Sequence, residues 1–191
     1  MKVLEIVRLA ATYLQLNNLL ETTMLGGSRA PNKNEVADIY LLVLCCNLTS
    51  NIMATDYIKL FKSVATRSVN GKVNIEQLTA DGIRLHTVVR ITNRNGNRLV
   101  YKMFNDYIKT ASGDVEVLFT YIPKDVELQE EITDYPQRIT ERIVAYGVAS
   151  EFSYIKAMYD DATIWDIRFK NALLSVATEK TGINMPARGW W

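Results

Sequence analysis

The residue types that most often do chemistry in proteins are few in this chain of 191 residues. There is one histidine, His86, and the only two cysteines are adjacent, at Cys45 and Cys46. One histidine and two neighbouring cysteines cannot supply the tetrahedral set of ligands that zinc requires. His86 falls in the middle of a predicted strand, where a lone histidine is more typical of a structural residue than of a catalyst.

Two further motifs also fit structural roles better than catalytic ones. Asp160-Asp161 lies on a predicted helix, where successive residues diverge by about 100° and do not converge on one metal ion. A helix cap or a solvated helix face is the better interpretation. Gly26-Gly27 lacks the preceding strand and the Lys-Ser/Thr ending of a phosphate-binding loop. We therefore expect no enzymatic activity, no metal and no cofactor.

Basic side chains gather between about residues 57 and 122, where acidic residues are fewer. They are Arg67, Lys72, Arg84, Arg90, Arg94, Arg98, Lys102 and Lys109. A platform for single-stranded nucleic acid needs exposed aromatic residues among such charges, and Tyr101 and Phe104 are candidates. The alternative, which we favour, is that Lys and Arg keep hairpin tips and sheet edges soluble. The net charge of the whole chain is only +1, so it gives no general attraction to nucleic acid.

The N-terminal part of the chain is predicted to be helical. Apolar residues at helical spacing predict an amphipathic helix over about residues 2–17. After a loop rich in Gly, Pro, Ser and Asn, Asn34 is expected to cap a second helix that runs to about Ala54. This helix is apolar on nearly every side between Ile39 and Cys46, which predicts the central and most buried helix. The two cysteines would then be buried thiols in a reducing compartment.

Neither composition nor the N-terminal residues indicate a membrane protein. Apolar residues make up 48% and charged residues 23%, which is ordinary for a soluble globular chain of one domain or two small ones. Glu5 and Arg8 interrupt the first apolar stretch, so we expect no signal peptide. The longest apolar run, IYLLVLCC, is far shorter than the roughly 20 residues of a membrane span.

Strand patterns begin beyond Asp56. Asn70-Gly71 and the turn over residues 93–97 mark two hairpins, because β-branched and aromatic residues fill the flanking arms. A third hairpin is expected to join residues 106–109 to residues 115–122. The sequence therefore predicts an antiparallel meander in this part of the chain.

Helical spacing returns at Pro136, which fits the first turn of a helix. One apolar stripe then keeps its phase from Ile143 to Val176. This predicts either one long helix or two helices that meet near Tyr159 with little change of direction. The expected fold class is α+β, with these parts: a helical bundle from residues 1–55 and 125–180, an inserted antiparallel β region over 56–124, and an extended C-terminal tail over 181–191.

Several large apolar side chains on the C-terminal helices lie outside that stripe. They are Tyr146, Phe152, Tyr159, Ile164 and Ile167. Single exposed apolar residues are normal on a monomer, but this group is larger than chance predicts. Either the β region covers the group, or it forms an interface with a neighbouring copy.

The sequence ends in MPARGWW, in which Trp190 and Trp191 follow Arg188 and a Gly. Burying two tryptophan side chains removes roughly 300–500 Å² of surface, worth about 8–12 kcal/mol. Ordering about six residues costs on the order of 6–12 kcal/mol, so this segment is ordered only if both rings are buried. It either folds back on its own helices or inserts into a partner as an aromatic anchor.

The C-terminal third resembles a known family. The residues that carry the likeness are Pro136, Ile143, the run Tyr146-Gly147-Val148-Ala149, Glu151-Phe152, Trp165, Arg188 and Trp190. With two N-terminal helices and a β insertion, the pattern is similar to head-to-tail adaptor proteins of tailed bacteriophages, including the tail tubular A, or gatekeeper, type of short-tailed phages. The middle of this chain departs from those relatives in being compact and rich in hairpins.

The resemblance implies a subunit of a dodecameric ring beneath the portal protein of the virion. Such adaptors extend the DNA channel, provide a platform for tail or nozzle proteins, and often grip the portal with a C-terminal segment. Arg188, Trp190 and Trp191 are then the expected portal-docking residues. Arg94, Arg98 and Lys72 are candidates for a surface that faces the tail or the channel, where genomic DNA passes without sequence specificity.

The sequence therefore predicts a structural virion protein that is made in the host cytoplasm. A ring closes through a heterologous interface, which needs two different patches on each subunit. The outer helix face with the five apolar residues and the β region are the candidates. The alternative hypothesis is a nucleic-acid-binding regulatory module that uses the basic β surface.

Overall fold

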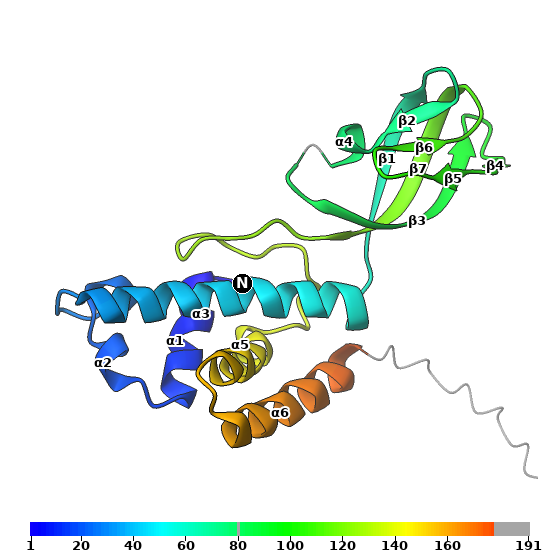
Figure 1. Ribbon diagram of the computed structural model, residues 1–191. Coiled ribbons are helices and arrows are strands. Elements are labelled where there is room, and N and C mark those ends of the chain that lie inside the picture. Colours follow the sequence, from blue (N-terminus) through cyan, green and yellow to red (C-terminus); the bar gives the residue numbers. More distant parts are fainter. Residues whose placement is uncertain (80, 178–191) are drawn as a thin grey trace, which may run out of the picture.

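A computed structural model describes residues 1–79 and 81–177 of the chain. The fold is α+β, as expected: a helical bundle carries a β region at one end (Figure 1). The helices of the bundle are α1 (Val3–Tyr13), α2 (Asn17–Leu20), α3 (Lys33–Ile52), α5 (Glu141–Ile155) and α6 (Tyr159–Ala177). A 3₁₀ turn (Thr23–Leu25) follows α2, and a π-helical turn (Met53–Tyr57) follows α3.

Helix α3 begins two residues earlier than the pattern predicted. Asn32, rather than Asn34, is its N-cap, and it forms a capping box with Glu35. Arg29 donates a hydrogen bond to Glu35 at 2.6 Å, and this bond, with the backbone N–H of Asn32, lowers the pKa of the Glu35 carboxyl. The Asn-x-x-Glu spacing of a capping box was present in the sequence, but it points to Asn32 rather than to Asn34.

Helix α5, rather than α3, is the central helix of the bundle. It packs against α1, α3 and α6, and it lies between α3 and α6 in Figure 1. Helix α3 instead leaves Tyr40 and Leu44 exposed, at 62% and 50% of their surface. Both cysteines are fully buried as free thiols, as predicted, and desolvation raises the pKa of each to about 12.

The segment Lys33–Tyr57 is long and apolar enough to cross a membrane by length and composition alone. This corrects the expectation from the short run IYLLVLCC, because the helix extends well beyond that run at both ends. The most apolar stretch of the segment is 44% buried inside the protein. A core helix of a soluble protein satisfies the same criterion, because it too is apolar on most sides.

The chain turns back after α5 so that α6 packs against it, which corrects the expectation of little change in direction (Figure 1). The chain reverses at Lys156–Met158, where Ala157 has a left-handed φ of +58°. Helix α5 also begins at Glu141, later than Pro136 indicated. The single apolar stripe did not reveal the reversal, because helical periodicity records which side is buried and not the direction of the axis.

Close packing of three helices depends on Gly147 in the middle of α5. A Cβ atom at this position would lie 2.4 Å from Thr49 Cγ2 of α3 and 3.1 Å from the Phe169 ring of α6. Ser150 Oγ donates a hydrogen bond to the Ala162 carbonyl across the same helix pair at 3.0 Å. The absence of a side chain at Gly147 therefore lets both neighbouring helices approach α5.

The β region consists of two antiparallel sheets rather than a meander. The first sheet has the order β1 (Leu60–Ser68), β7 (Gly113–Ile122), β3 (Arg84–Asn93), β4 (Arg98–Leu99). The second has the order β2 (Lys72–Asn74), β6 (Tyr107–Lys109), β5 (Lys102–Met103), and the short helix α4 (Ile75–Leu78) follows β2. Both sheets contribute to one small core, which includes Val73, Ile108 and Phe119.

The predicted turn at Asn70-Gly71 is confirmed, since both residues have positive φ and Val69 pairs with Lys72. The predicted third hairpin is wrong. Strand β6 pairs with β2 and β5, whereas β7 pairs with β1 and β3. The turn between β6 and β7 therefore connects the two sheets, and these two strands do not pair with each other.

The β region leaves the bundle at the end of α3 and returns along residues 123–140. Asn47 on α3 holds this returning segment against the bundle. Its side chain forms two hydrogen bonds with the backbone of Val126, at 3.0 and 3.1 Å. The Tyr135 hydroxyl donates to the Ser50 carbonyl nearby. Burial raises the pKa of Tyr135, which therefore stays a neutral donor.

Candidate functional site

Three of the five apolar residues expected at a subunit interface are exposed on α6. Tyr159, Ile164 and Ile167 are 63%, 50% and 54% exposed. The opposite face of the same helix, with Phe169 and Leu173, is buried in the bundle. Helix α6 therefore has an apolar side that its own chain leaves uncovered within the described residues. We call Ile164 and Ile167 the α6 face. Tyr159 lies at the start of the helix, where its ring centroid is 6.5 Å from that of Tyr154.

The other two residues do not join that face. Phe152 is 2% exposed, so its assignment to a subunit interface was wrong. Helix α5 has neighbours on three sides, and a residue outside its main stripe is therefore buried as well. Tyr146 is half-buried, because its ring stacks on Tyr13 at 5.1 Å and faces Trp165 at 5.8 Å between ring centroids.

The stack of Tyr13, Tyr146 and Trp165 continues the apolar surface toward α1. Arg168 lies 4.8 Å over the Trp165 ring, and Arg142 donates to the Tyr146 hydroxyl at 2.7 Å. A hollow of about 340 Å³ opens beside the stack. Sequence reasoning did not find this cluster, because only the packing of α1 on α5 and α6 brings residue 13 beside residues 146 and 165.

A second apolar face lies on α3 and was also missed. Tyr40 and Leu44 are one helical turn apart and exposed, and Ala37 precedes them by a turn on the same side. We call these three residues the α3 face. The apolar run itself was the signal in the sequence. A helix that is apolar on every side needs neighbours on every side, and any side that its own chain does not cover is left as an exposed apolar face. The α3 face and the α6 face belong to two different helices that both pack on α5 (Figure 1).

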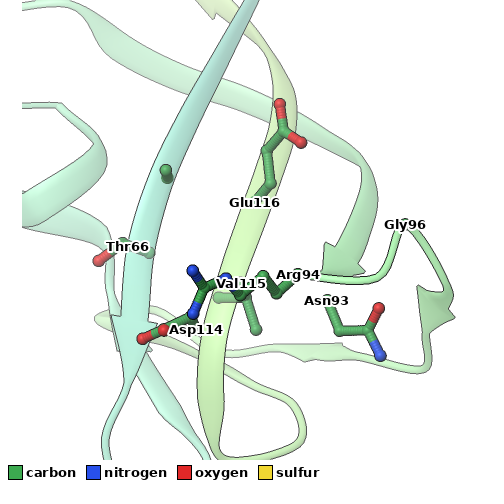
Figure 2. A pocket seen from close by; sticks show the side chains of 8 residues that line it. Thr66, Asn93, Arg94, Gly96, Asp114, Val115 and Glu116 are labelled. Atoms are coloured by element: carbon green, nitrogen blue, oxygen red, sulfur yellow. The ribbon is translucent and has the colours of Figure 1, made fainter.

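The three basic residues assigned to a channel or tail surface are exposed, but the structure does not bring them together. Arg94 and Arg98 flank the turn between β3 and β4, whereas Lys72 belongs to the second sheet. Figure 2 shows Arg94 in a hollow that it shares with Asp114 and Glu116. Carboxylates in the same hollow offset the positive charge of Arg94, so this hollow is a poor site for an anion.

Lys72 instead belongs to a row of lysines on the outer face of the second sheet. The register of β2, β6 and β5 places Lys72 opposite Lys109 and Lys109 opposite Lys102. The next residues along, Val73 and Ile108, are fully buried. Successive side chains of a strand point to opposite faces of the sheet, so all three lysines point outward. Sequence reasoning named each lysine, but their common row depends on a pairing of strands that it did not predict.

Two aromatic rings lie beside the lysine row. Phe104 and Tyr107 stack with their centroids 4.7 Å apart. Lys72 Nζ lies 4.6 Å from the centroid of the Tyr107 ring, and Lys102 Nζ lies 5.7 Å from that of Phe104. Tyr101, the other aromatic candidate, donates its hydroxyl to the Val88 carbonyl and packs against the core of the β region.

The remaining chemistry-bearing residues form no cluster in the described part of the chain. His86 is exposed on β3 and lines a shallow hollow with Thr55, Lys59 and Phe61. Within residues 1–79 and 81–177, no three His, Cys, Asp or Glu side chains are grouped to hold a metal ion. The predicted docking residues Arg188, Trp190 and Trp191 lie outside the described residues.

No protein-family model matches the chain, and no curated protein matches it at a significant level.

Proposed function

We propose that this protein is a structural subunit that assembles with copies of itself, and that it serves as a head-to-tail adaptor in the virion of a tailed bacteriophage. One observation supports this best. The bundle has two separate apolar faces, one on α6 and one on α3, on two different helices that both pack on its central helix. Exposed apolar surface of this kind is typical of protein interfaces.

The two faces meet the requirement for a ring. A heterologous contact joins two different patches, and it closes into a ring when the rotation between successive copies allows it. We propose that the α6 face of one copy packs on the α3 face of the next. Ile164 and Ile167 would then pack as ridges into the grooves beside Tyr40 and Leu44. The α3 face takes the place of the β region as the second patch, because it lies on the bundle and carries apolar side chains at helical spacing.

The adaptor role extends this proposal through the resemblance of the C-terminal third. The partners would be the portal protein on one side of the ring and tail or nozzle proteins on the other. Arg188, Trp190 and Trp191 would dock into the portal, with the two rings as anchors and the guanidinium as a charge-assisted contact. The protein would act at the junction of head and tail after its synthesis in the host cytoplasm.

Light scattering over a range of protein concentrations tests the assembly, with and without a portal protein. We expect Ile164→Glu with Ile167→Glu to give a monomer, because two charges would have to be desolvated in the contact. The matched control is Val100→Glu, since Val100 is 92% exposed and lies away from both faces. The proposal is wrong if the wild-type chain stays monomeric with a portal, or if the α6 variant assembles as the control does.

A second experiment tests the docking residues. Changing Trp190 and Trp191 to Ala should leave the helical circular dichroism and self-association unchanged, while portal binding is lost. A loss of folding in this variant would show that the two rings belong to the core of their own chain, and the docking proposal would then fail.

A further inference from the structure

The lysine row of the second sheet is an unusual arrangement of like charges. Lys72, Lys109 and Lys102 occupy directly opposite positions on three neighbouring strands. Adjacent strands lie about 4.8 Å apart, so the row extends over roughly 10 Å. Like charges in directly opposite positions destabilise a sheet. An arrangement that costs stability in the free protein calls for a role in binding.

The row also lacks the ion pairs that other lysines of this protein form. Lys62 pairs with Asp81, Lys156 with Asp38 and Lys170 with Asp166. By contrast, no ion pair involves Lys72, Lys102 or Lys109 within the part of the chain that the structure describes. The exposed Asp106 lines one hollow with Lys72 and with the basic Arg67.

The two stacked rings hold the ends of the row in place. Lys72 covers Tyr107 and Lys102 covers Phe104, both at cation–π distance. The rings lie nearly parallel, with 15° between their planes. These ring contacts orient Lys72 and Lys102 before any ligand binds.

We propose that the outer face of the β2–β6–β5 sheet binds the phosphodiester backbone of nucleic acid without reading its sequence. Lysine ammonium groups act as point charges for phosphates. Phosphates along one strand of a duplex are spaced about 3.4 Å apart along the axis, so a row of roughly 10 Å faces about three of them. The row is complete in a single copy of the chain. The inference therefore goes beyond the proposed assembly and does not depend on it.

Fluorescence anisotropy with a labelled 30-base-pair duplex and a labelled single strand, over a series of salt concentrations, tests this inference. About three phosphate contacts predict a slope near −2.7 for the logarithm of the duplex association constant against that of salt. Changing all three lysines to Gln should lower duplex affinity at least tenfold at low salt and reduce the slope by about 2 to 3. The matched control changes Lys33, Lys59 and Lys124 to Gln, which removes the same charge from other exposed positions.

Three outcomes would overturn the inference. The first is an equal loss of affinity in the control, which would show that duplex affinity depends only on the overall charge of the protein. The second is binding of polyglutamate of matched charge as tightly as the duplex. The third is a selective loss of single-strand binding in Phe104→Leu with Tyr107→Leu, which would mean that bases stack on the rings. The monomeric α6 variant should bind the duplex as the wild type does per copy, so failure of this inference and failure of the assembly proposal are distinguishable.

Discussion

The helical bundle and the β region differ in the charge that they carry. In the bundle, ion pairs such as Lys156–Asp38 and Lys170–Asp166 join charged side chains, whereas two apolar helix faces are exposed. Residues 60–122 include nine basic and five acidic residues, a net charge of +4. Among the described residues, no ion pair involves the lysine row. The remaining residues have a net charge of −3. The near-neutral total therefore conceals a separation of charge between the two regions.

This contrast indicates that the two regions have different partners. Apolar helix faces gain free energy by removing surface from water, and this suits contact with another folded protein. Unpaired lysines gain by releasing counterions from a polyanion. The two regions also have separate hydrophobic cores, one around α5 and one around Phe119. Substitutions in each region can therefore test whether the contrast holds for stability as well as for binding.

The largest effect is expected from the cores. Phe152→Ala should destabilise the protein by about 3–5 kcal/mol, because it removes a buried aromatic side chain from the bundle. Phe119→Ala should cost a similar amount, with faster amide hydrogen exchange confined to the β region. Urea unfolding and hydrogen exchange measure both. A cost for Phe152→Ala within the roughly 0.5 kcal/mol typical of surface substitutions would contradict its burial.

A smaller effect is expected at the closest helix contact. Gly147→Ala should destabilise the bundle by about 1–3 kcal/mol, because the new Cβ meets Thr49 Cγ2. Thr49→Ala in the same chain removes that methyl group and should recover part of the loss. Thermal unfolding of the two single variants and the double variant measures the coupling. Purely additive effects would show that Thr49 is not the cause.

A pH-dependent effect is expected at the start of α3. The hydrogen bond from Arg29 lowers the pKa of Glu35 in the folded protein below its unfolded value. The resulting stabilisation is present above the ordinary pKa of a glutamate and is lost as the pH falls through the folded pKa. Glu35→Gln should lower stability near neutral pH and reduce its fall in acid, as urea titrations at several pH values would reveal. An unchanged acid dependence in the variant would contradict this assignment.

The smallest effect is expected in the lysine row, and it has the opposite sign. Lys109→Gln should stabilise the β region by about 0.2–1 kcal/mol at low salt, because Lys109 stands between two like charges. The gain should vanish near 1 M salt, where charges are screened within about 3 Å. Unfolding at two ionic strengths measures it. A loss of stability at low salt would show that the row is not under repulsion.

The sequence predicted features that depend on neighbouring residues. The α+β class, the helical segments, the burial of Cys45 and Cys46 and the turn at Asn70-Gly71 all follow from local periodicity and turn chemistry. It also identified the exposed face of α6, because residues three and four apart share one side of a helix wherever the helix packs.

Only the tertiary structure decided where those elements meet. The reversal at Ala157 buried Phe152, and the pairing of β6 with β2 and β5 assembled the lysine row. Neither result follows from a local pattern, because the direction of a helix and the partner of a strand depend on contacts between residues far apart in the chain. Local sequence determines which side of each element is apolar or charged, whereas long-range packing determines which of those sides remain exposed.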